Sequence, residues 1–331
     1  MIPPRVAQKR RQASYNNIDY RLRPGKYAER QMIVEAIGRL RFHDLKSYRY
    51  VGMGSIYFTD FKLLFRSLGI SSMISIEQEE DDRDRFDWNK PYDQVQMLYG
   101  STSVHLPALD WSHPSIVWLD YDGQIAGSKL DDLDLVVSKA ASGTMVMISV
   151  NAEKPAPEGM RKEDREADPI LALRTMIGRE RTPTDLKPEQ LRGAQAVKVY
   201  YRIIRDAVEA SLARTNALIT QPSQKLVWKQ LLNFQYKDGA SMITVGGAVF
   251  KAEHINSFDA GNFTALDFYR PDEKPYVIEI PLLTTKEMAQ LEKSAALDPA
   301  ICVDLPWLDN KERSLFIKMY RYLPNFVSAE L

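Results

Sequence analysis

Hydrophobic and polar positions follow strand and helix periods in turn over the first half of the chain. Five short apolar runs predict β-strands, at residues 48–53, 72–77, 93–100, 115–123 and 144–151. The segments between them are long enough for helical crossovers, except that 101–114 favours a loop. Strands that alternate with crossovers are typical of a doubly wound, mostly parallel sheet. We therefore predict an α/β protein with a Rossmann-like sheet.

A leading helix is predicted over residues 27–42, where apolar residues recur at helical spacing from Met32 to Leu40. Pro24 and Gly25 mark its start. The chain after the fifth strand behaves differently. Residues 154–168 are rich in proline and charge, and an exposed connection is expected there.

The second half predicts further helices over residues 169–178, 188–214, 284–296 and 310–323, and a strand over 276–281. Asp238-Gly239 lies between two apolar runs, which predicts an antiparallel β-hairpin over 225–250. We divide the chain into three parts. These are a basic arm (1–26), an α/β domain (27–251) with a helical insertion at about 154–220, and a C-terminal extension (252–331) packing on that domain.

Composition narrows the class of protein. The 44% hydrophobic and 27% charged residues are typical of a soluble globular chain. Cys302 is the single cysteine, so an internal disulfide and a cysteine-based zinc site are excluded. The N-terminus lacks the apolar region of a signal peptide, and no run of 18 apolar residues occurs. We expect a cytoplasmic protein with no membrane span.

Charge is balanced overall, with 44 basic and 44 acidic residues, but residues 1–50 hold twelve Arg and Lys against four Asp and Glu. Lys9, Arg10 and Arg11 lie in the arm and would suit the phosphates of a nucleic acid or an acidic partner. A solvated positive face explains the same residues, and both interpretations stay open.

The first candidate site is the turn after the first strand, VGMGSIYFTDF (51–61). Gly52 and Gly54 lack a Cβ, so the backbone can turn sharply and approach a cofactor, and the next helix offers free N–H groups. A pyrophosphate-binding fingerprint needs a third glycine where Tyr57 stands, which disfavours a nicotinamide or flavin dinucleotide. A tight turn without a ligand is the alternative.

Candidate residues also end the next three strands. Glu77 ends the second strand, where an acid accepts hydrogen bonds from ribose hydroxyls, although it would also cap a helix. Gly100 and Ser101 follow the third strand, where a small residue would lie against an adenine or simply form a turn. Asp120 and Asp122 follow the fourth strand, at the edge where open α/β sheets bind ligands.

The order of these motifs resembles class I S-adenosylmethionine-dependent methyltransferases. The leading helix and the late hairpin match elements of that fold. More narrowly, YVGMGSIYFTDF and WLDYDG resemble a family of bacterial O-methyltransferases, some of which accompany antiviral defence loci. The resemblance covers about residues 20–155 and is loose beyond them.

This resemblance implies S-adenosylmethionine as the cofactor. Gly52, Gly54 and Ser55 would line its methionine part, and Glu77 would hold its ribose. Gly100 and Ser101 would lie near the adenine, and Asp120 would face the methyl group. The sequence departs from the family in lacking an acid on the adenine side and the Asn-Pro-Pro-Tyr motif of amino-methylating DNA enzymes. Cysteine-dependent cytosine methylation is also disfavoured.

Methyl transfer to oxygen needs alignment and benefits from a base. Asp120 is the first catalytic candidate and Lys26 the second. Together with Lys154 and Glu279 they resemble the Lys-Asp-Lys-Glu set of ribose 2′-O-methyltransferases, although Lys26 also suits a helix start.

A metal-dependent variant would need an Asp-Asn pair after the fifth strand. The sequence offers only Asn151 and Glu153 there, so we predict no metal.

The leading hypothesis is thus methyl transfer from S-adenosylmethionine to an oxygen of an unknown substrate. The alternative is a non-catalytic component with the same fold that docks a partner in a multi-protein, defence-related system. The third hypothesis is a dinucleotide-dependent oxidoreductase, which is disfavoured because Tyr57 stands where the pyrophosphate-binding fingerprint needs a glycine. Small molecule, nucleic acid and protein acceptors remain open, as does oligomerisation.

Overall fold

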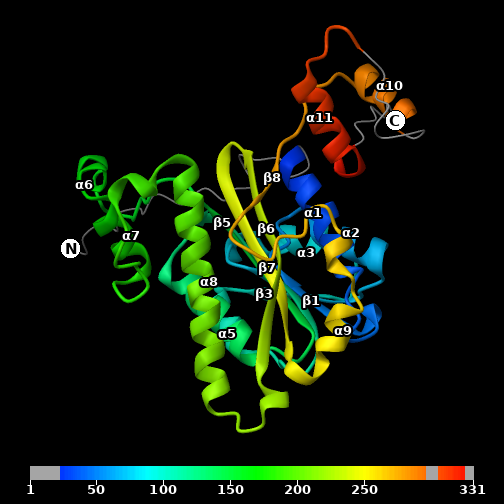
Figure 1. The fold of residues 1–331 in the computed structure, drawn as a ribbon. Helices are drawn as coiled ribbons and strands as arrows, with labels where there is room; N and C mark the ends of the chain where they lie inside the picture. Colours follow the sequence, from blue (N-terminus) through cyan, green and yellow to red (C-terminus); the bar gives the residue numbers. More distant parts are fainter. Residues whose placement is uncertain (1–22, 296–304, 325–331) are drawn as a thin grey trace, which may run out of the picture.

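The computed structural model describes residues 23–295 and 305–324 as one eight-stranded sheet covered by helices on both faces (Figure 1). Most of the predicted basic arm and Cys302 lie outside the described residues, so nucleic-acid binding by the arm stays a prediction. The division of the chain into an arm, an α/β domain and a C-terminal extension also stays a prediction. Within the described ranges no helix combines the length and the apolar character needed to cross a bilayer.

The sheet has the strand order β3-β2-β1-β4-β5-β7-β6-β8. The first five strands pair in parallel, β7 is antiparallel to both β5 and β6, and β8 is parallel to β6. This confirms the predicted α/β class with a mostly parallel sheet and a late antiparallel hairpin. The strands are β1 (Arg49–Gly52), β2 (Ser72–Glu77), β3 (Val95–Tyr99), β4 (Ser115–Gln124), β5 (Thr144–Asn151), β6 (Leu226–Asp238), β7 (Ala240–Lys251) and β8 (Tyr276–Ile278).

Two hydrophobic cores lie on opposite faces of the sheet because successive strand residues point to opposite sides. Trp118 of β4 packs into one core and its neighbours Val117 and Leu119 into the other. The first core is covered by α1 (Pro24–Ile37), α2 (Thr59–Leu68), α3 (Arg83–Asn89), α9 (Ile255–Asp259) and α11 (Asn310–Met319). The second is covered by α4 (Thr102–Ala108), α5 (Gly127–Lys139), α7 (Pro169–Ile177) and α8 (Gly193–Ala217).

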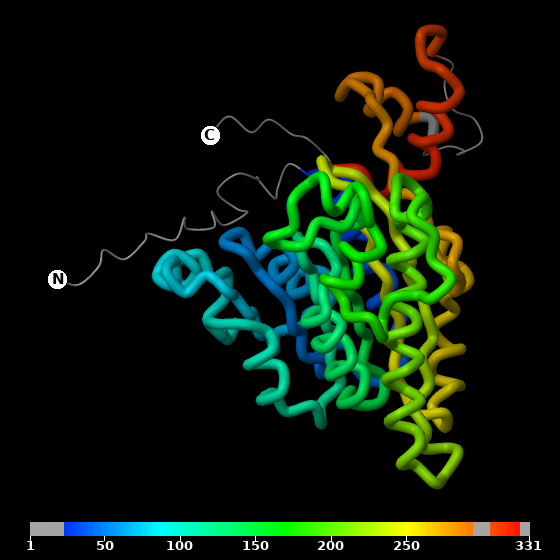
Figure 2. The backbone as a smooth tube through the Cα atoms, turned by 90° about the vertical axis from the view of Figure 1, so that its left-hand side faces the viewer, coloured from blue at the N-terminus to red at the C-terminus, as the bar shows by residue number. Residues whose placement is uncertain are grey.

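The remaining helices lie toward the ends of the molecule. Figure 2 shows α10 (Thr285–Ala295) and α11 projecting together from one end of the sheet, with the long helix α8 running down beside the hairpin. Helix α6 (Lys162–Ala167) directly precedes α7. The predicted strand at 276–281 is present but ends at Ile278.

Two differences from the sequence-based prediction lie close to the predicted site residues. Helix α1 begins at Pro24 rather than at residue 27, because proline has a helical φ and needs no N–H partner in the first turn. Lys26 therefore belongs to the helix and is buried. The loop predicted over 101–114 was also wrong in part, since α4 forms there and buries Leu106.

The N-terminus of α1 is capped by the tip of the β6–β7 hairpin. The Asp238 carboxylate accepts hydrogen bonds from the backbone N–H groups of Gly25, at 3.1 Å, and Lys26, at 2.8 Å. A Cβ on Gly25 would lie 2.9 Å from this carboxylate, so glycine permits the close approach. A side chain more than 200 residues away thus supplies the cap that helix starts usually find locally.

Asp238→Ala removes both acceptors and leaves two helical N–H groups without a protein partner. We expect the free energy of unfolding to fall by about 1–2 kcal/mol in urea denaturation. Lys237→Ala, at the exposed neighbouring position, is the control and should change stability by less than about 0.5 kcal/mol. Equal stability of the two variants would contradict the capping role.

Candidate active site

The predicted site residues of the sheet follow the carboxyl ends of β1, β2, β3 and β4, which parallel pairing brings to one edge. They form two neighbouring groups. One contains the glycine turn, Glu77 and the segment at Gly100. The other contains Lys26 of α1 and Asp120 of β4.

The glycine turn is held by polar side chains of β2. Gly54 N–H donates to the Ser75 hydroxyl at 3.0 Å, and Ser55 N–H donates to Glu77 Oε1 at 2.9 Å. Ser55 and Phe58 both have a left-handed backbone, with φ of 45° and 48°. Such a conformation costs a non-glycine residue about 1–2 kcal/mol, so the bond to Glu77 helps to hold a strained turn.

Packing within the chain also requires glycine at positions 52 and 54. A Cβ on Gly52 would overlap the hydroxyl of Tyr50, and one on Gly54 would lie 2.6 Å from the ring of Phe58. The sequence analysis explained them by close approach of a cofactor or by a tight turn without a ligand. The structure adds that buried aromatic rings of the same chain occupy the space beside them.

Glu77 is the acidic group of this first site. Only 8% of the residue is exposed, and burial raises the pKa of its carboxyl to about 7, although hydrogen bonds from Ser75 and Ser55 oppose the shift. Both of these hydrogen bonds end on Oε1. A buried acid that titrates near neutral pH, at the end of β2, suits a ligand that donates hydrogen bonds.

The segment after β3 lies against Glu77. Gly100 N–H donates to the Glu77 carbonyl at 2.9 Å, and its φ of +127° requires glycine. The Ser101 hydroxyl pairs with the Ser103 hydroxyl at 2.7 Å, and the ring of His105 bonds the Tyr99 carbonyl at 2.8 Å beside Gly100. Small and polar groups therefore border this end of the site.

Lys26 and Asp120 are in direct contact. The Lys26 Nζ lies 2.6 Å from Asp120 Oδ1 and 2.8 Å from Glu29 Oε2. It also lies 4.3 Å from the centre of the Trp118 ring and 5.8 Å from that of Tyr236, within reach of cation–π attraction. The Lys26 side chain is 2% exposed and that of Asp120 is 16% exposed, so the pair opens to solvent on the carboxylate side.

Charge states follow from these contacts. Burial opposes the charge of Lys26, but Asp120 and Glu29 outweigh it and raise the pKa of the ammonium. Burial likewise opposes the charge of Asp120, but Lys26 outweighs it and lowers the pKa of the carboxyl. Lys26 is thus protonated and Asp120 ionised at neutral pH. A protonated lysine cannot act as a general base.

Glu29 completes the cluster, and the sequence analysis missed it. Burial raises the pKa of this fully buried carboxyl, and its Oε1 accepts a hydrogen bond from the Thr244 hydroxyl. The Thr244 hydroxyl in turn bonds Ser149 at 2.7 Å, and Ser149 accepts from the Trp118 indole N–H at 2.9 Å. This chain of polar groups fixes Glu29 beneath Lys26.

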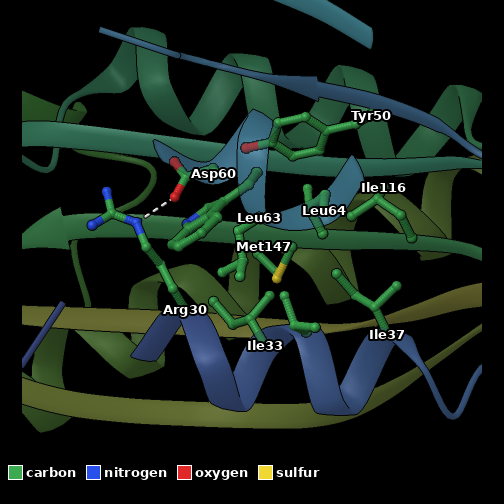
Figure 3. A pocket seen from close by; sticks show the side chains of 11 residues that line it. Arg30, Ile33, Ile37, Tyr50, Asp60, Leu63, Leu64, Ile116 and Met147 are labelled. Atoms are coloured by element: carbon green, nitrogen blue, oxygen red, sulfur yellow. Dashed lines mark hydrogen bonds and ion pairs between the residues drawn. The ribbon is translucent and has the colours of Figure 1, made fainter. Parts of the chain in front are cut away.

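A second buried ion pair lies one helical turn along α1. Arg30 donates to Asp60 of α2 at one side of a small pocket whose apolar lining includes Ile33, Tyr50 and Met147 (Figure 3). The space between these side chains is about 10 Å³, close to the smallest that holds a water molecule. The Arg30–Asp60 ion pair therefore joins α1 to α2 beside an apolar space that is almost completely filled.

Comparison with known protein families assigns the chain to one of them. Residues 18–331 match the family described as Putative O-methyltransferase. The chain belongs to this family. The resemblance inferred from the motifs is thereby confirmed, and the match extends it beyond residue 155. A search of curated protein sequences found no match.

Three of the solved structures to which the chain is similar are 10–14% identical to it. Cofactor-bound Rv0187 from MTB is 14% identical, with a TM-score of 0.36 over 75% of this chain and 84% of its own. The O-methyltransferase from Bacillus cereus in complex with SAH is 13% identical, with a TM-score of 0.38 over 71% and 86%. The fibrillarin/Nop5p complex is 10% identical, with a TM-score of 0.37 over 68% of this chain and 83% of its own. None of these matches supports the expected link to antiviral defence.

The four-residue set of ribose 2′-O-methyltransferases is not assembled in this family member. Lys154 and Glu279 are both exposed, and neither contacts the Lys26–Asp120 pair. The acid beside Lys26 is Glu29, three residues along the same helix.

Glu153, one of the two residues weighed as metal ligands, instead accepts the Ser241 N–H at 2.9 Å and braces the hairpin. Among the described residues no three His, Cys, Asp or Glu side chains gather into a metal site.

Lys26→Met leaves Glu29 and Asp120 buried without their shared cation. We expect the free energy of unfolding to fall by about 3–5 kcal/mol at pH 8. The loss should shrink toward pH 5, because the folded variant then binds a proton on carboxyls with raised pKa values while the unfolded chain remains ionised. Urea denaturation across this pH range, with exposed Lys237→Met as control, measures both effects. A pH-independent loss would contradict the charge assignment.

Proposed function

We propose that this protein transfers the methyl group of S-adenosylmethionine to an oxygen of its acceptor, at the carboxyl edge of the sheet. The observation that carries the proposal is the Asp120 carboxylate. It is kept ionised by a buried lysine, partly open, and beside the glycine turn and Glu77. The family of the chain supports this class of reaction.

The residues present fit the cofactor. Glu77 would accept hydrogen bonds from the ribose hydroxyls, and Gly52, Gly54 and Ser55 would border the methionine part. Gly100 and Ser101 would border the adenine, where a Cβ on Gly100 would lie 3.1 Å from the His105 ring. When bound, S-adenosylmethionine supplies a methyl group that is already activated by the sulfonium charge.

Asp120 is the residue that would touch the acceptor. Its Oδ1 accepts from Lys26, and Oδ2 accepts no hydrogen bond from the described residues. An ionised oxygen facing the opening would accept a hydrogen bond from the acceptor hydroxyl and take up its proton as the methyl group is transferred. Lys26 would act through Asp120, as a positioning residue rather than as a base.

We take a small molecule as the acceptor, because a cleft of ligand size lies at the start of α1, although neither Lys26 nor Asp120 lines it. A cleft of about 520 Å³ lies between the hairpin tip, β8 and α11, and Tyr236, Asp238 and Gly25 form the wall next to the Lys26 cluster. Ligand pockets commonly measure roughly 300–1,000 Å³. The cleft would admit the acceptor from the side of the projecting C-terminal helices (Figure 1).

Cofactor affinity should depend on pH through Glu77. The free carboxyl has a pKa of about 7, and hydrogen bonds donated by a ribose favour its ionised form. Below pH 7 a proton must leave when the ligand binds, so the Kd of S-adenosylhomocysteine should rise by up to about tenfold per pH unit.

Isothermal titration from pH 5.5 to 8.5 measures this dependence. Glu77→Gln should bind weakly at every pH and lose the dependence, whereas exposed Glu79→Gln should behave like the wild type. Tight binding by Glu77→Gln would remove Glu77 from the cofactor site.

Asp120→Asn tests the acceptor side. We expect methyl transfer from labelled S-adenosylmethionine to the small-molecule fraction of a bacterial extract to fall by about 10²–10⁴-fold. S-adenosylhomocysteine binding should stay within about threefold, since Asp120 would face the acceptor. The matched control is Asp134→Asn, on an exposed ion pair with Arg214. Labelled RNA or protein in place of small molecules would overturn the assigned acceptor class, and undiminished transfer would overturn the role of Asp120.

A further inference from the structure

Helix α5 carries a buried carboxylate that neither the motifs nor the cofactor site explains. Asp132 is 5% exposed, and its Oδ2 accepts hydrogen bonds from the hydroxyls of both Thr102 and Tyr121, the latter at 2.6 Å. Three separate elements, the start of α4, the second half of β4 and the middle of α5, therefore meet at one oxygen atom.

Burying the Asp132 carboxylate costs free energy that an apolar side chain at this position of α5 would not cost. Leu130, Leu133 and Val136 of α5 are buried in an apolar core, and in the described chain no cation pairs with Asp132. A buried carboxylate is tolerated only when hydrogen bonds compensate for its lost hydration. Two hydroxyl donors supply that compensation, so the position of each hydroxyl is tied to that of the other.

The two hydroxyls belong to opposite halves of the site. Thr102 directly follows Ser101, on the segment that Gly100 fastens to Glu77. Tyr121 directly follows Asp120. Asp132 thus bridges the segment that would border the cofactor and the segment that would face the acceptor.

The backbone alone fixes neither segment firmly. The pairing of β4 with β5 shifts register between Asp120 and Gln124, so regular ladder bonds do not hold Tyr121. Helix α4 spans seven residues and contains Pro107, and the side chain of its N-cap residue Ser101 makes no capping hydrogen bond. The bonds to Asp132 supply the constraint that the ladder and the helix cap lack.

We infer that Asp132 is a positioning residue that couples the cofactor side of the site to Asp120. The inference rests on the proposed function for the identity of the two sides. The contacts through Asp132 are independent of it. Loosening either hydroxyl bond should disturb the segment on the other side of the carboxylate.

The first experiment measures S-adenosylhomocysteine binding by isothermal titration. Tyr121→Phe alters only the acceptor side, yet it should raise the Kd about five- to tenfold. Thr102→Val should have a similar effect, and the effects of the two substitutions should be non-additive in the double variant, because both bonds end on one carboxylate oxygen.

Two controls separate coupling from general loss of stability. Tyr200→Phe removes the hydroxyl of a buried tyrosine that donates to the Glu153 carbonyl at 2.9 Å rather than to Asp132. Asp131→Asn changes the exposed neighbour that pairs with Arg181. Both should bind within about twofold of the wild type. Binding by Tyr121→Phe equal to that of Tyr200→Phe, or additive effects in the double variant, would overturn the coupling.

The second experiment does not depend on the cofactor. The backbone N–H groups of Val104 and His105 bond the Ser101 carbonyl and report on the first turn of α4. Tyr121→Phe should speed their hydrogen exchange about tenfold, while Tyr200→Phe should leave it unchanged. Unchanged exchange in Tyr121→Phe would overturn the inference. If the wild type does not bind S-adenosylhomocysteine, the proposed function fails, and this exchange result still decides whether Asp132 couples the two segments.

Discussion

The buried ammonium of Lys26 is the interaction on which the site depends. It lies between Asp120 at the end of β4 and Glu29 on its own helix, over the ring of Trp118. Without it, two carboxylates would share a nearly dry space and one would have to take up a proton. Asp120 thus stays ionised only because α1 lies where its Lys26 reaches the carboxylate.

Other parts of the chain hold that lysine in place. Asp238 at the hairpin tip caps the first turn of α1, and Arg30 fastens the next turn to Asp60 of α2. The late hairpin therefore contributes directly to the site, although it lies far from it in the sequence. The C-terminal helices border a cleft on the other side of the same helix start. Under the proposed function, these contacts hold the Asp120 carboxylate and border the cleft through which the acceptor would enter.

Much of the sheet was predictable from the sequence because its signals are local. Short apolar runs predicted all five parallel strands, and Asp238-Gly239 predicted the hairpin. The pairing of Lys26 with Asp120 was expected only through a family resemblance. Glu29 and Arg30 were missed although they carry a signal. With Lys26 and Ile33 they fall on one helical face, so charged residues continue the apolar stripe toward the N-terminus.

Other features depend on long-range contacts that no local pattern contains. The cap from Asp238 joins positions more than 200 residues apart, and the bridge through Asp132 joins three elements at one atom. Lys154 and Glu279 were expected beside Asp120 by analogy, but both are exposed, and the acid beside Lys26 is Glu29.

A crystal structure in complex with S-adenosylhomocysteine tests the placement of the site most directly. We expect both ribose hydroxyls on Glu77, the sulfur turned toward the open side of Asp120, and the contact between Lys26 and Asp120 intact. A complex in which Glu77 stays bonded only to Ser55 and Ser75, with the ligand bound elsewhere, would contradict it.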